Sequence, residues 1–299
     1  MYKIYNDSIN TSGNYTTLNR LSKILKLPIT DQIQDNIIGI HAYKFGKKVI
    51  NKSINYILII GGTDINIDIN DCEKKKIILQ AIDQAKYVIC FNNYIFEKVK
   101  KFNLGNLKVI PQSVEHLKPN NFNLIKFISE KYNIGNINKI FLLVGNIREV
   151  KDPFYLKSME KYFIENDIYI VYIGKVIEGS YEFKMPFIKI ENLDKKDIFS
   201  CYQQSDGLIN CSKSEGMSCS ILEAMLYQCP VYARKNEGNL SIVEDGYNGY
   251  IFNSINELRK SLNKSTDITK KNAYFYVCTC HNLEIERNLY LKLTNYNKN

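Results

Sequence analysis

Short apolar runs alternate with amphipathic segments of helical length along most of the 299-residue chain. This alternation is typical of βα units, in which each buried strand of a parallel sheet is followed by a helix that packs on the sheet. Parallel strands are covered on both faces, so they appear in a sequence as nearly continuous apolar runs. The pattern therefore predicts an α/β fold built on parallel sheets.

The apolar runs form two series, separated by a polar, asparagine-rich connection. The expected strands are 2–5, 36–41, 56–60, 87–91 and 107–110 in the first series, and 139–145, 168–174, 187–190, 207–211, 230–233 and 249–252 in the second. The clearest expected helices are 73–85, 93–102, 153–165, 195–204, 219–228 and 255–263.

Two Rossmann-like domains follow from the two series. Chains of this length usually divide into two domains, because a single hydrophobic core stops growing at about this size. We expect an N-terminal domain over residues 1–118, which is short for its class, and a linker over 119–137. A C-terminal domain then spans 138–280, and a closing helix falls within the last segment, 281–299.

Charge and hydropathy exclude several classes of protein. The net charge is +9, but the lysines are dispersed among Asn and Ile without an aromatic and basic module, so we expect no nucleic-acid partner. The positive field would instead mildly steer an anionic ligand. The longest apolar runs are far below the length that spans a membrane, and no apolar leader follows Met1. We therefore expect a cytoplasmic protein without a membrane span.

The cysteines and histidines do not indicate a disulfide framework or a zinc site. The eight cysteines are scattered and lie mainly in apolar segments, which favours reduced, packed thiols. The three histidines are His41, His116 and His281, and the chain has no C-x-x-C pair. We therefore expect no structural metal.

The loop after the strand 139–145 carries two cations. Ligands of open parallel sheets bind beyond the carboxyl ends of the strands. Gly145 ends this strand, and Arg148 and Lys151 follow it at a spacing of three residues. A guanidinium and an ammonium together can hold a diphosphate, or both can be ordinary solvated loop charges. Gly174 ends the next strand, where it either admits a planar base close to the backbone or makes a turn.

The stretch SEGMSCSILEAM, which begins at Ser214, carries two glutamates around the start of an expected helix. Gly216, Met217 and Ser218 present their backbone N–H groups at this helix start. Glu223 has a structural explanation, because Ser220 and Glu223 match the spacing of a capping box. Glu215 lies in the loop before the helix, where its carboxylate suits hydrogen bonding to sugar hydroxyls.

These residues resemble the donor-site signature of retaining GT-B glycosyltransferases, and specifically of glycosyltransferase family 4. In that family two glutamates are separated by seven residues, as Glu215 and Glu223 are here, and the motifs AM and PV follow in both. VGNIREVKDP is similar to the family's Gly-Arg-Lys loop, and NEGNLSIVEDGYNGYIF is similar to its next segment. The resemblance implies a GT-B fold, in which two Rossmann-like domains face a central cleft.

The resemblance also implies roles for the matching residues. Arg148 and Lys151 would hold the diphosphate of a nucleotide-sugar donor and stabilise charge on the leaving phosphate. Glu215, with the amides of residues 216–218, would bind the donor sugar, and Glu223 would take the ribose hydroxyls. Catalysis of this type needs neither a metal ion nor a cofactor, since the nucleotide sugar is a co-substrate. The acceptor is not identified.

Five further residues of the first domain are candidates for the site. Gly13 follows the first strand in TSGN and would form a glycine loop near the donor phosphate. His41, at the end of a strand, would contact the reacting sugar, or it is a satisfied strand-end histidine. Gly62, Thr63 and Asp64 touch the acceptor or make a turn; the run that begins at Asp64, DINIDIND, lacks the glycine and glutamate of a calcium loop.

Two other functions remain open from the sequence. The first is a non-catalytic GT-B subunit that regulates another glycosyltransferase, and the second is a different sugar-phosphate enzyme on the same scaffold. An inverting transferase would need a base that faces the acceptor, and only His41 stands out for that role. The preferred hypothesis requires the acidic pair and the basic pair to meet at one crevice.

Overall fold

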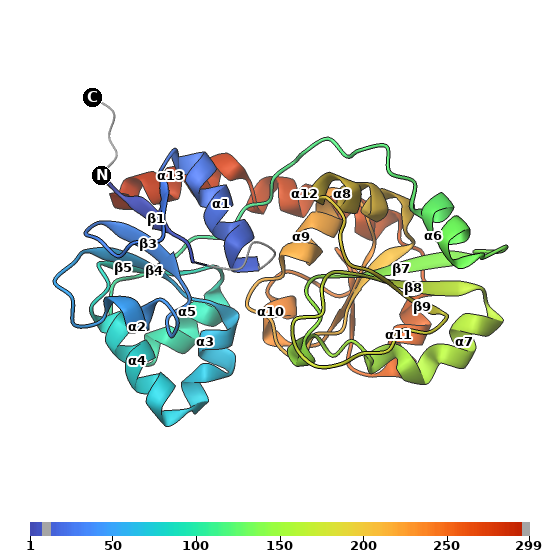
Figure 1. Cartoon of the computed structure of the whole chain (residues 1–299), viewed down its shortest axis with the longest axis horizontal. Coiled ribbons are helices and arrows are strands. Elements are labelled where there is room, and N and C mark those ends of the chain that lie inside the picture. Colours follow the sequence, from blue (N-terminus) through green and yellow to red (C-terminus); the bar gives the residue numbers. More distant parts are fainter. Residues whose placement is uncertain (8–12, 295–299) are drawn as a thin grey trace. The chain divides into compact units, whose positions relative to one another are not determined.

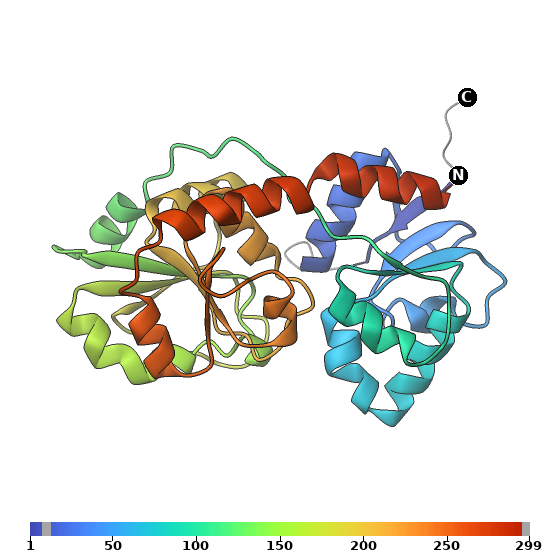
Figure 2. The same cartoon turned by 180° about the vertical axis from the view of Figure 1, so that it is seen from behind.

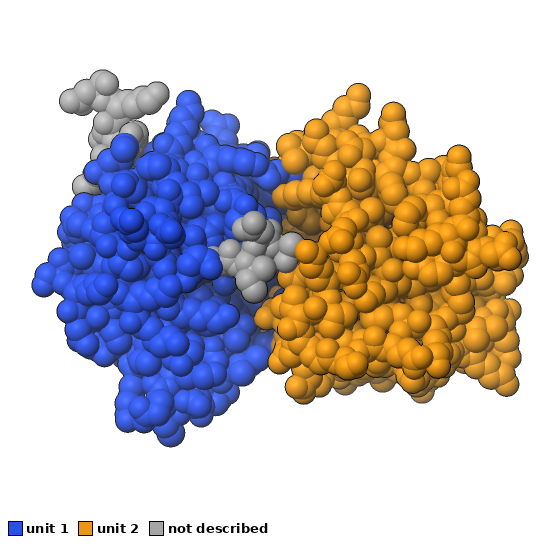
Figure 3. Space-filling view, in the orientation of Figure 1, with its two compact units in different colours: residues 1–115, 214–217, 280–299 blue, residues 116–213, 218–279 orange. Residues whose placement is uncertain are grey.

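The structure is a computed structural model that describes residues 1–7 and 13–294. Its contacts divide the chain into two compact units, which are coloured separately in Figure 3. Unit 1 comprises residues 1–115, 214–217 and 280–299, and unit 2 comprises 116–213 and 218–279. Each unit is built around a parallel sheet of six strands.

The sheet of unit 1 has the strand order β2-β1-β3-β4-β5-β6. All of its strand pairs are parallel. The chain reverses its direction of winding between β1 and β3, so these two neighbours define a switch point. The strands are β1 (Lys3–Tyr5), β2 (Ile29–Thr30), β3 (Ile37–Ile40), β4 (Tyr56–Ile59), β5 (Tyr87–Cys90) and β6 (Leu107–Val109).

Helices cover both faces of this sheet (Figure 1). One face carries α1 (Gly13–Leu25) and the C-terminal α13 (Leu283–Thr294), which pack against each other. The other face carries α2 (Gly46–Val49), α3 (Gly62–Asn66), α4 (Cys72–Asp83) and α5 (Asn93–Lys100), with the 3₁₀ turn η1 (Asp68–Asn70) between α3 and α4.

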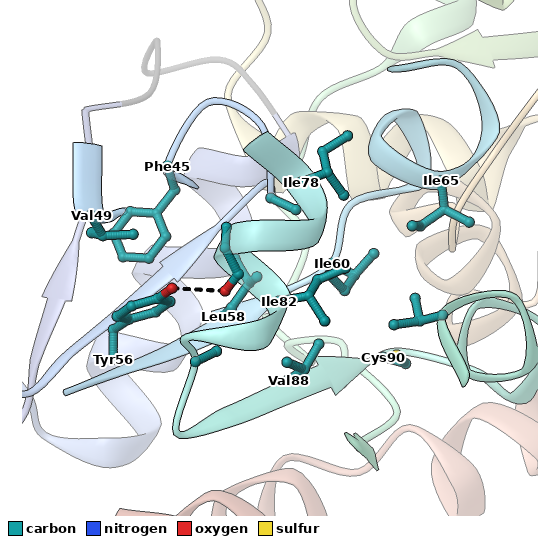
Figure 4. Packing of buried hydrophobic residues seen from close by; sticks show 14 of the residues in the cluster. Phe45, Val49, Tyr56, Leu58, Ile60, Ile65, Ile78, Ile82, Val88 and Cys90 are labelled. Atoms are coloured by element: carbon teal, nitrogen blue, oxygen red, sulfur yellow. Dashed lines mark hydrogen bonds between the residues drawn. The ribbon is translucent and has the colours of Figure 1, made fainter. Parts of the chain in front are cut away.

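The alternation of side chains along β4 builds the two cores of unit 1. Ile57 and Ile59 point to the α1 and α13 face, whereas Tyr56 and Leu58 point to the α4 and α5 face. Tyr56 is fully buried, and its hydroxyl donates a 2.7 Å hydrogen bond to the carbonyl of Ala81 on α4 (Figure 4). This bond satisfies the one polar atom that the tyrosine brings into the core.

A buried ion pair fixes α13 on unit 1. The Arg20 guanidinium of α1 donates from Nε and Nη2 to the two oxygens of Glu286, each over 2.9 Å. Neither side chain is more than 3% exposed. The Ser113 hydroxyl also donates to Glu286. Figures 1 and 2 show α1 and α13 side by side from opposite directions. The sequence reasoning predicted the closing helix but not this pair.

The sheet of unit 2 has the strand order β12-β11-β10-β7-β8-β9, again with all pairs parallel. The chain winds outward on one side from β7 and on the other side from β10, so these neighbours form the switch point. The strands are β7 (Lys139–Val144), β8 (Ile168–Ile173), β9 (Phe187–Ile190), β10 (Gly207–Asn210), β11 (Val231–Arg234) and β12 (Tyr250–Phe252).

The helices of unit 2 pack around this sheet. Phe163 of α7 and Leu258 of α11 are buried in one core with Phe141 and Ile170 of the strands. The helical elements are α6 (Leu124–Tyr132), η2 (Glu149–Lys151), η3 (Tyr155–Met159), α7 (Glu160–Glu165), α8 (Lys195–Gln204), α9 (Cys219–Leu226), α10 (Glu237–Leu240), α11 (Ile255–Ser261) and α12 (Asp267–Cys280).

The structure confirms every expected strand, with ends that differ by one residue at most, and the expected helices of both series. Six helices of the described residues were not assigned from the sequence, among them the short α2, α3 and α10. The longer ones are α1, α12 and α6, and α6 lies inside the range 119–137 that was expected to be a linker. Asn123 accounts for the start of α6, because its side chain accepts a hydrogen bond from the Lys126 N–H.

All eight cysteines are unpaired thiols, and half of them are buried. Burial raises the pKa of Cys90 and of Cys201 to about 12, so both thiols stay protonated. The expectation of packed thiols is wrong for three cysteines that are exposed: Cys72, Cys278 and Cys280.

Candidate functional site

A pocket lies in unit 2 at the carboxyl ends of β7 and β10, at the switch point of the sheet. Its volume is about 390 Å³, part of which is open to solvent. Open parallel sheets bind ligands at such points, because the loops after the two strands diverge there and leave a crevice. The polar side chains of its lining are Asn146, Lys151, Asn210, Ser212 and Ser220.

The buried wall of this pocket is electrically neutral. Burial raises the pKa of Tyr172 well above its usual range, and its hydroxyl donates to the carbonyl of Pro153. Burial also raises the pKa of the Cys211 thiol far above its usual range, so this cysteine is not a thiolate nucleophile. The pocket therefore offers Lys151 as its one cationic side chain among the described lining residues.

Gly145 lines the pocket, and Gly174 approaches it from the next loop. Gly145 has a φ of 133°, and a Cβ on it would meet no atom within 4 Å, so its backbone is open on that side. Gly174 has a φ of 151°, and its Cβ would lie 2.2 Å from the Gly145 carbonyl oxygen. Close contact between the loops after β7 and β8 thus explains the glycine at 174. Its predicted contact with a planar base stays a prediction.

The loop that carries Arg148 and Lys151 is held at its far end. Asp152 follows Lys151 in a left-handed conformation, and its carboxylate accepts a 2.7 Å hydrogen bond from the Arg234 guanidinium. That guanidinium also lies 4.1 Å from the centre of the Tyr155 ring. The Lys213 N–H donates to the Val150 carbonyl over 2.9 Å. These contacts restrict where the Lys151 backbone can lie.

The structure places Lys151 in the pocket lining and Arg148 three residues before it, at the start of η2. Both residues are half-buried. Arg148 is not a lining residue of the pocket, and no described residue pairs with its guanidinium. The predicted grip of both cations on one diphosphate stays a prediction, with Lys151 the better placed of the two.

The expected capping box of α9 is wrong. The helix begins at Cys219, and its N-cap is Ser218 in an extended conformation, so Ser220 lies inside the first turn. Ser218 makes no side-chain cap bond to the helix. Its hydroxyl instead lies 3.3 Å from Asn210 Nδ2 and 3.1 Å from the Ser220 hydroxyl. Helix capping therefore does not explain the carboxylate of Glu223.

Glu223 lies on α9 one turn after the pocket residue Ser220. Its side chain is 12% exposed, and Lys195 Nζ approaches Glu223 Oε1 to 3.6 Å. The buried Tyr202 hydroxyl lies 3.5 Å from Glu223 Oε2. Burial raises the pKa of Tyr202 well above its usual range, so this phenol remains a donor to the carboxylate.

Residues 214–217 belong to unit 1, in which their backbone is held by side-chain amides. Asn66 Nδ2 donates to the Glu215 carbonyl over 3.1 Å, and Asn92 Nδ2 donates to the Gly216 carbonyl over 2.8 Å. A Cβ on Gly216 would come within 2.8 Å of Gly62, so both positions need glycine. Glu215 is thus assigned to a different unit from Glu223 and Lys151. Their meeting at one crevice stays a prediction.

His41 follows β3, next to the switch point of the unit 1 sheet. Its φ is 83°, a left-handed conformation that only a few per cent of non-glycine residues adopt. Its side chain is 8% exposed, and Nδ1 lies 2.5 Å from Asp64 Oδ1. Its Nε2 lies 3.9 Å from Asp68 Oδ2, and Asp68 Oδ1 accepts a 2.7 Å hydrogen bond from Lys74.

His41, Asp64 and Asp68 are also the described residues whose ligand atoms, all within 4.8 Å of one another, could hold a metal ion. Asp64, however, already accepts hydrogen bonds from the backbone N–H groups of Ala42, Tyr43 and Gly61. Lys74 occupies one oxygen of Asp68. Because the protein itself uses most of these oxygens, we interpret the cluster as a hydrogen-bond network.

The remaining predicted residues of unit 1 lie as follows. Gly13 is the first residue of α1 and is exposed, and a Cβ on it would meet no atom within 4 Å. Thr11 and Ser12 of the same predicted glycine loop lie outside the described residues. Asp64 is fully buried, which favours the turn over a direct contact with an acceptor.

The sequence reasoning missed several pocket and network residues. Asn210 ends β10 and Ser212 follows it, whereas Asp68 begins η1 and Lys74 lies in α4. The signal that could have found Asn210 and Ser212 is their position at the end of an apolar run. No comparable signal marks Arg234, because its partner Asp152 is far away in the sequence.

No helix in the described part of the chain has the length and apolar character needed to cross a membrane. The family model of "Glycosyl transferases group 1" matches residues 125–275. Glycosyltransferase 1 domain-containing protein 1 of Xenopus tropicalis is 30% identical over 276 residues, which cover 85% of this chain and 80% of the relative.

A second relative is UDP-Gal:alpha-D-GlcNAc-diphosphoundecaprenol alpha-1,3-galactosyltransferase of Escherichia coli, which is 26% identical over 206 residues. The match covers 61% of this chain and about half of that enzyme, 51%. Among solved structures, Anabaena Alr3699/HepE in complex with UDP-glucose superposes with a TM-score of 0.76 at 13% identity. The superposition covers 98% of this chain and 99% of that one.

Proposed function

Because the chain belongs to the glycosyl transferases group 1 family, we propose that it transfers a hexose-type sugar from a nucleoside-diphosphate donor to an acceptor hydroxyl, with retention of configuration. Two parallel six-stranded sheets and the GT-B structural neighbours establish the GT-B fold. Membership of glycosyltransferase family 4, retention and independence from metal ions are parts of the proposal.

The observation that carries the proposal is the pocket of unit 2. It lies at the switch point between β7 and β10, and it combines an open glycine backbone at Gly145 with the ammonium of Lys151. Backbone that lacks a Cβ admits a phosphate close to its N–H groups, and a cation beside it offsets the phosphate charge. The neutral wall of Tyr172 and Cys211 strengthens that attraction by excluding other charges.

Lys151 and Arg148 would supply most of the catalysis. As the bond between the anomeric carbon and the phosphate oxygen breaks, its electron pair stays on that oxygen. A fixed cation close to this oxygen stabilises the developing charge more than the charge of the ground state. The contacts of Asp152 and Val150 hold the loop in place, so the loop would need little rearrangement during the reaction.

The other predicted residues would bind and orient the donor. Glu223 would accept hydrogen bonds from the ribose hydroxyls, because no helix cap requires its carboxylate. Glu215, with the amides of Gly216, Met217 and Ser218, would bind the sugar hydroxyls. His41 would contact the reacting sugar. Gly13 and Gly174 would approach the donor as backbone only.

Retention would follow from attack on the face that the leaving group vacates. The acceptor oxygen bonds to the anomeric carbon, and the bond between that carbon and the phosphate oxygen breaks. The acceptor proton passes to the departing phosphate oxygen. This sequence needs no enzymatic base and no metal ion. The protein cations offset the charge that develops on the phosphate oxygen, and the phosphate itself takes up the acceptor proton.

Nucleotide sugars should raise the thermal midpoint of the protein. A ligand that binds only the folded state stabilises it by about 2.7 kcal/mol when its concentration is 100 times Kd. UDP-sugars come first in the panel, because the Anabaena protein binds UDP-glucose; GDP- and ADP-sugars complete it. The midpoint is measured by differential scanning fluorimetry, with free sugar 1-phosphates as controls.

The best binder is then assayed for transfer and hydrolysis, and proton NMR of the product gives its anomeric configuration. A midpoint that no nucleotide sugar moves would contradict the proposed function. Binding without any turnover would favour the non-catalytic subunit instead. An inverted product would remove retention from the proposal and leave the transfer intact.

Glu223→Gln should weaken nucleotide binding about tenfold, with little change in the thermal midpoint of the free protein. The substitution keeps the side-chain shape but removes the charge that strengthens hydrogen bonds to ribose. Isothermal titration with the nucleoside diphosphate measures the effect. Glu165→Gln, in the exposed part of α7, is the matched control and should change neither quantity. Lower stability with unchanged affinity would assign Glu223 a structural role.

A further inference from the structure

The imidazole of His41 is fixed on one side by a saturated carboxylate. Asp64 is fully buried, and Asp64 Oδ2 accepts from the N–H groups of Ala42 over 2.7 Å and Gly61 over 2.8 Å. Asp64 Oδ1 accepts from the Tyr43 N–H over 3.1 Å and lies 2.5 Å from His41 Nδ1. Three backbone donors therefore hold this carboxylate in place before the histidine is considered.

The short contact identifies the proton on the ring. If Nδ1 carried a lone pair, it would face the lone pairs of Asp64 Oδ1 at 2.5 Å, and the two acceptors would repel each other. A proton on Nδ1 turns the same contact into a hydrogen bond to a carboxylate. The Lys44 N–H also approaches Nδ1, but at 3.4 Å. Nδ1 cannot donate to Asp64 and accept from Lys44 at the same time. The shorter contact, to Asp64, therefore decides that Nδ1 carries the proton.

The opposite ring nitrogen keeps its lone pair. His41 Nε2 lies 3.9 Å from Asp68 Oδ2, which is too long for a hydrogen bond. Lys74 Nζ lies 2.7 Å from Asp68 Oδ1 and offsets the charge of that carboxylate. Among the described residues, no hydrogen bond therefore uses Nε2. Asp64, Asp68 and Lys74 are the charged groups that α3, η1 and α4 bring to this ring.

We propose that Asp64 is a positioning residue, which holds His41 as the neutral Nδ1–H tautomer so that Nε2 accepts a hydrogen bond from a sugar hydroxyl. The proposal rests on the proposed glycosyltransferase function. The position of His41 supports it, because the ring follows β3 at the switch point of its sheet and its backbone is strained. The hydroxyl belongs either to the donor sugar or to the acceptor.

The first test reads the tautomer directly and needs no substrate. Long-range ¹H–¹⁵N spectra of protein labelled at histidine distinguish the protonated ring nitrogen from the unprotonated one. The chain has three histidines, so His41→Gln, His116→Gln and His281→Gln assign the signals. We expect the Nδ1–H tautomer for His41 across the pH range in which the ring is neutral. An Nε2–H tautomer, or a ring that stays doubly protonated, would overturn the proposal.

Asp64→Asn should reverse the tautomer. The asparagine Oδ1 can still accept from Ala42 and Gly61, although the Tyr43 N–H loses its acceptor. Its Nδ2 donates to His41 Nδ1 and moves the ring proton to Nε2. Loss of the correct tautomer by this type of substitution is the behaviour described for the aspartate of serine protease triads. Because Nε2–H cannot accept from a hydroxyl, kcat should fall roughly tenfold or more, while Kd for the free nucleoside diphosphate stays unchanged.

Asp71→Asn is the matched control. Asp71 also accepts two backbone N–H groups, from Glu73 and Lys74, as the N-cap of α4, but it does not contact His41. Both variants should lose some stability, and only Asp64→Asn should change the tautomer and kcat. If Asp64→Asn does not fold, the wild-type spectrum alone decides. Equal effects of both variants on kcat would reduce Asp64 to a structural role.

Two comparisons keep this inference separate from the proposed function. Absence of nucleotide-sugar binding in wild type would reject the function and leave the tautomer result intact. Hydrolysis of the donor without acceptor, compared with transfer, shows which hydroxyl Nε2 contacts. A loss confined to transfer assigns the acceptor hydroxyl, and an equal loss in both reactions assigns the donor sugar.

Discussion

Lys151→Ala should lower kcat by about 10²–10³-fold and leave the fold intact. Removal of one preorganised group that stabilises developing charge has an effect of this size in other active sites. Lys151 is half-buried in the pocket lining, so its loss creates no large cavity in either core. Steady-state kinetics with the donor identified by thermal shift measures the change, and far-ultraviolet circular dichroism checks the fold.

Two further variants make this result specific. Lys161→Ala, at an 88% exposed position of α7, removes the same charge away from the pocket and should leave kcat unchanged. Lys151→Arg keeps the charge but spreads it over a planar group, so it should recover part of the activity. A kcat for Lys151→Ala within a factor of two of wild type would refute the assigned role.

Glu286→Ala should destabilise unit 1 by about 3–5 kcal/mol, the typical effect of breaking a buried ion pair by removal of one partner. The substitution leaves the Arg20 guanidinium buried without its carboxylate, and the Ser113 hydroxyl loses its acceptor. We expect a lower denaturation midpoint in urea. Hydrogen exchange of the backbone amides of α1 and α13 reports on this unit.

A variant that removes the whole polar group should be much less damaging. Arg20→Met, Ser113→Ala and Glu286→Leu together replace the buried network with apolar side chains of similar size, a change that is often neutral. Glu73→Ala breaks the pair with Lys76, in which both side chains are more than 70% exposed, and it should leave the midpoint almost unchanged. A small effect of Glu286→Ala would show that water reaches Arg20.

Most of the predicted strands are parallel strands buried on both faces, whereas β6 is partly exposed. In β4 every residue from Tyr56 to Ile59 is buried, so the run YILII has no polar interruption. Local patterns fail where burial is slight. The helix α12 buries only Thr269, Ala273 and Val277 along its length, so its apolar stripe is too weak to identify from the sequence.

The start of α9 shows why helix ends are harder to predict than helices. Ser218 and Ser220 are two residues apart, and either can precede a helix, but only Ser220 has a glutamate three residues later. The backbone decides otherwise, since Ser218 is the residue in the extended conformation. Tertiary contacts with Asn210, which the sequence does not reveal, engage the Ser218 hydroxyl.

The candidate site was predictable where it consists of strand-end residues. Gly145 and Lys151 were selected from the loop after an apolar run, and the structure places both in the pocket lining. From the sequence, Asp64 was considered only as a residue that contacts the acceptor or makes a turn. Its contact with His41 joins the segments that follow two neighbouring strands, and no local spacing reveals it.

The position of α13 in the sequence affects how the protein is made. Tyr290 and Leu293 of this last helix complete the core against Ile57 and Ile59, which the ribosome delivers long before. At translation rates of about 5–20 residues per second, the N-terminal sheet waits roughly ten to forty seconds for this helix. During that interval part of an isoleucine-rich face is exposed to solvent and to chaperones. A C-terminal truncation would leave this face exposed permanently, and the protein would be prone to aggregation.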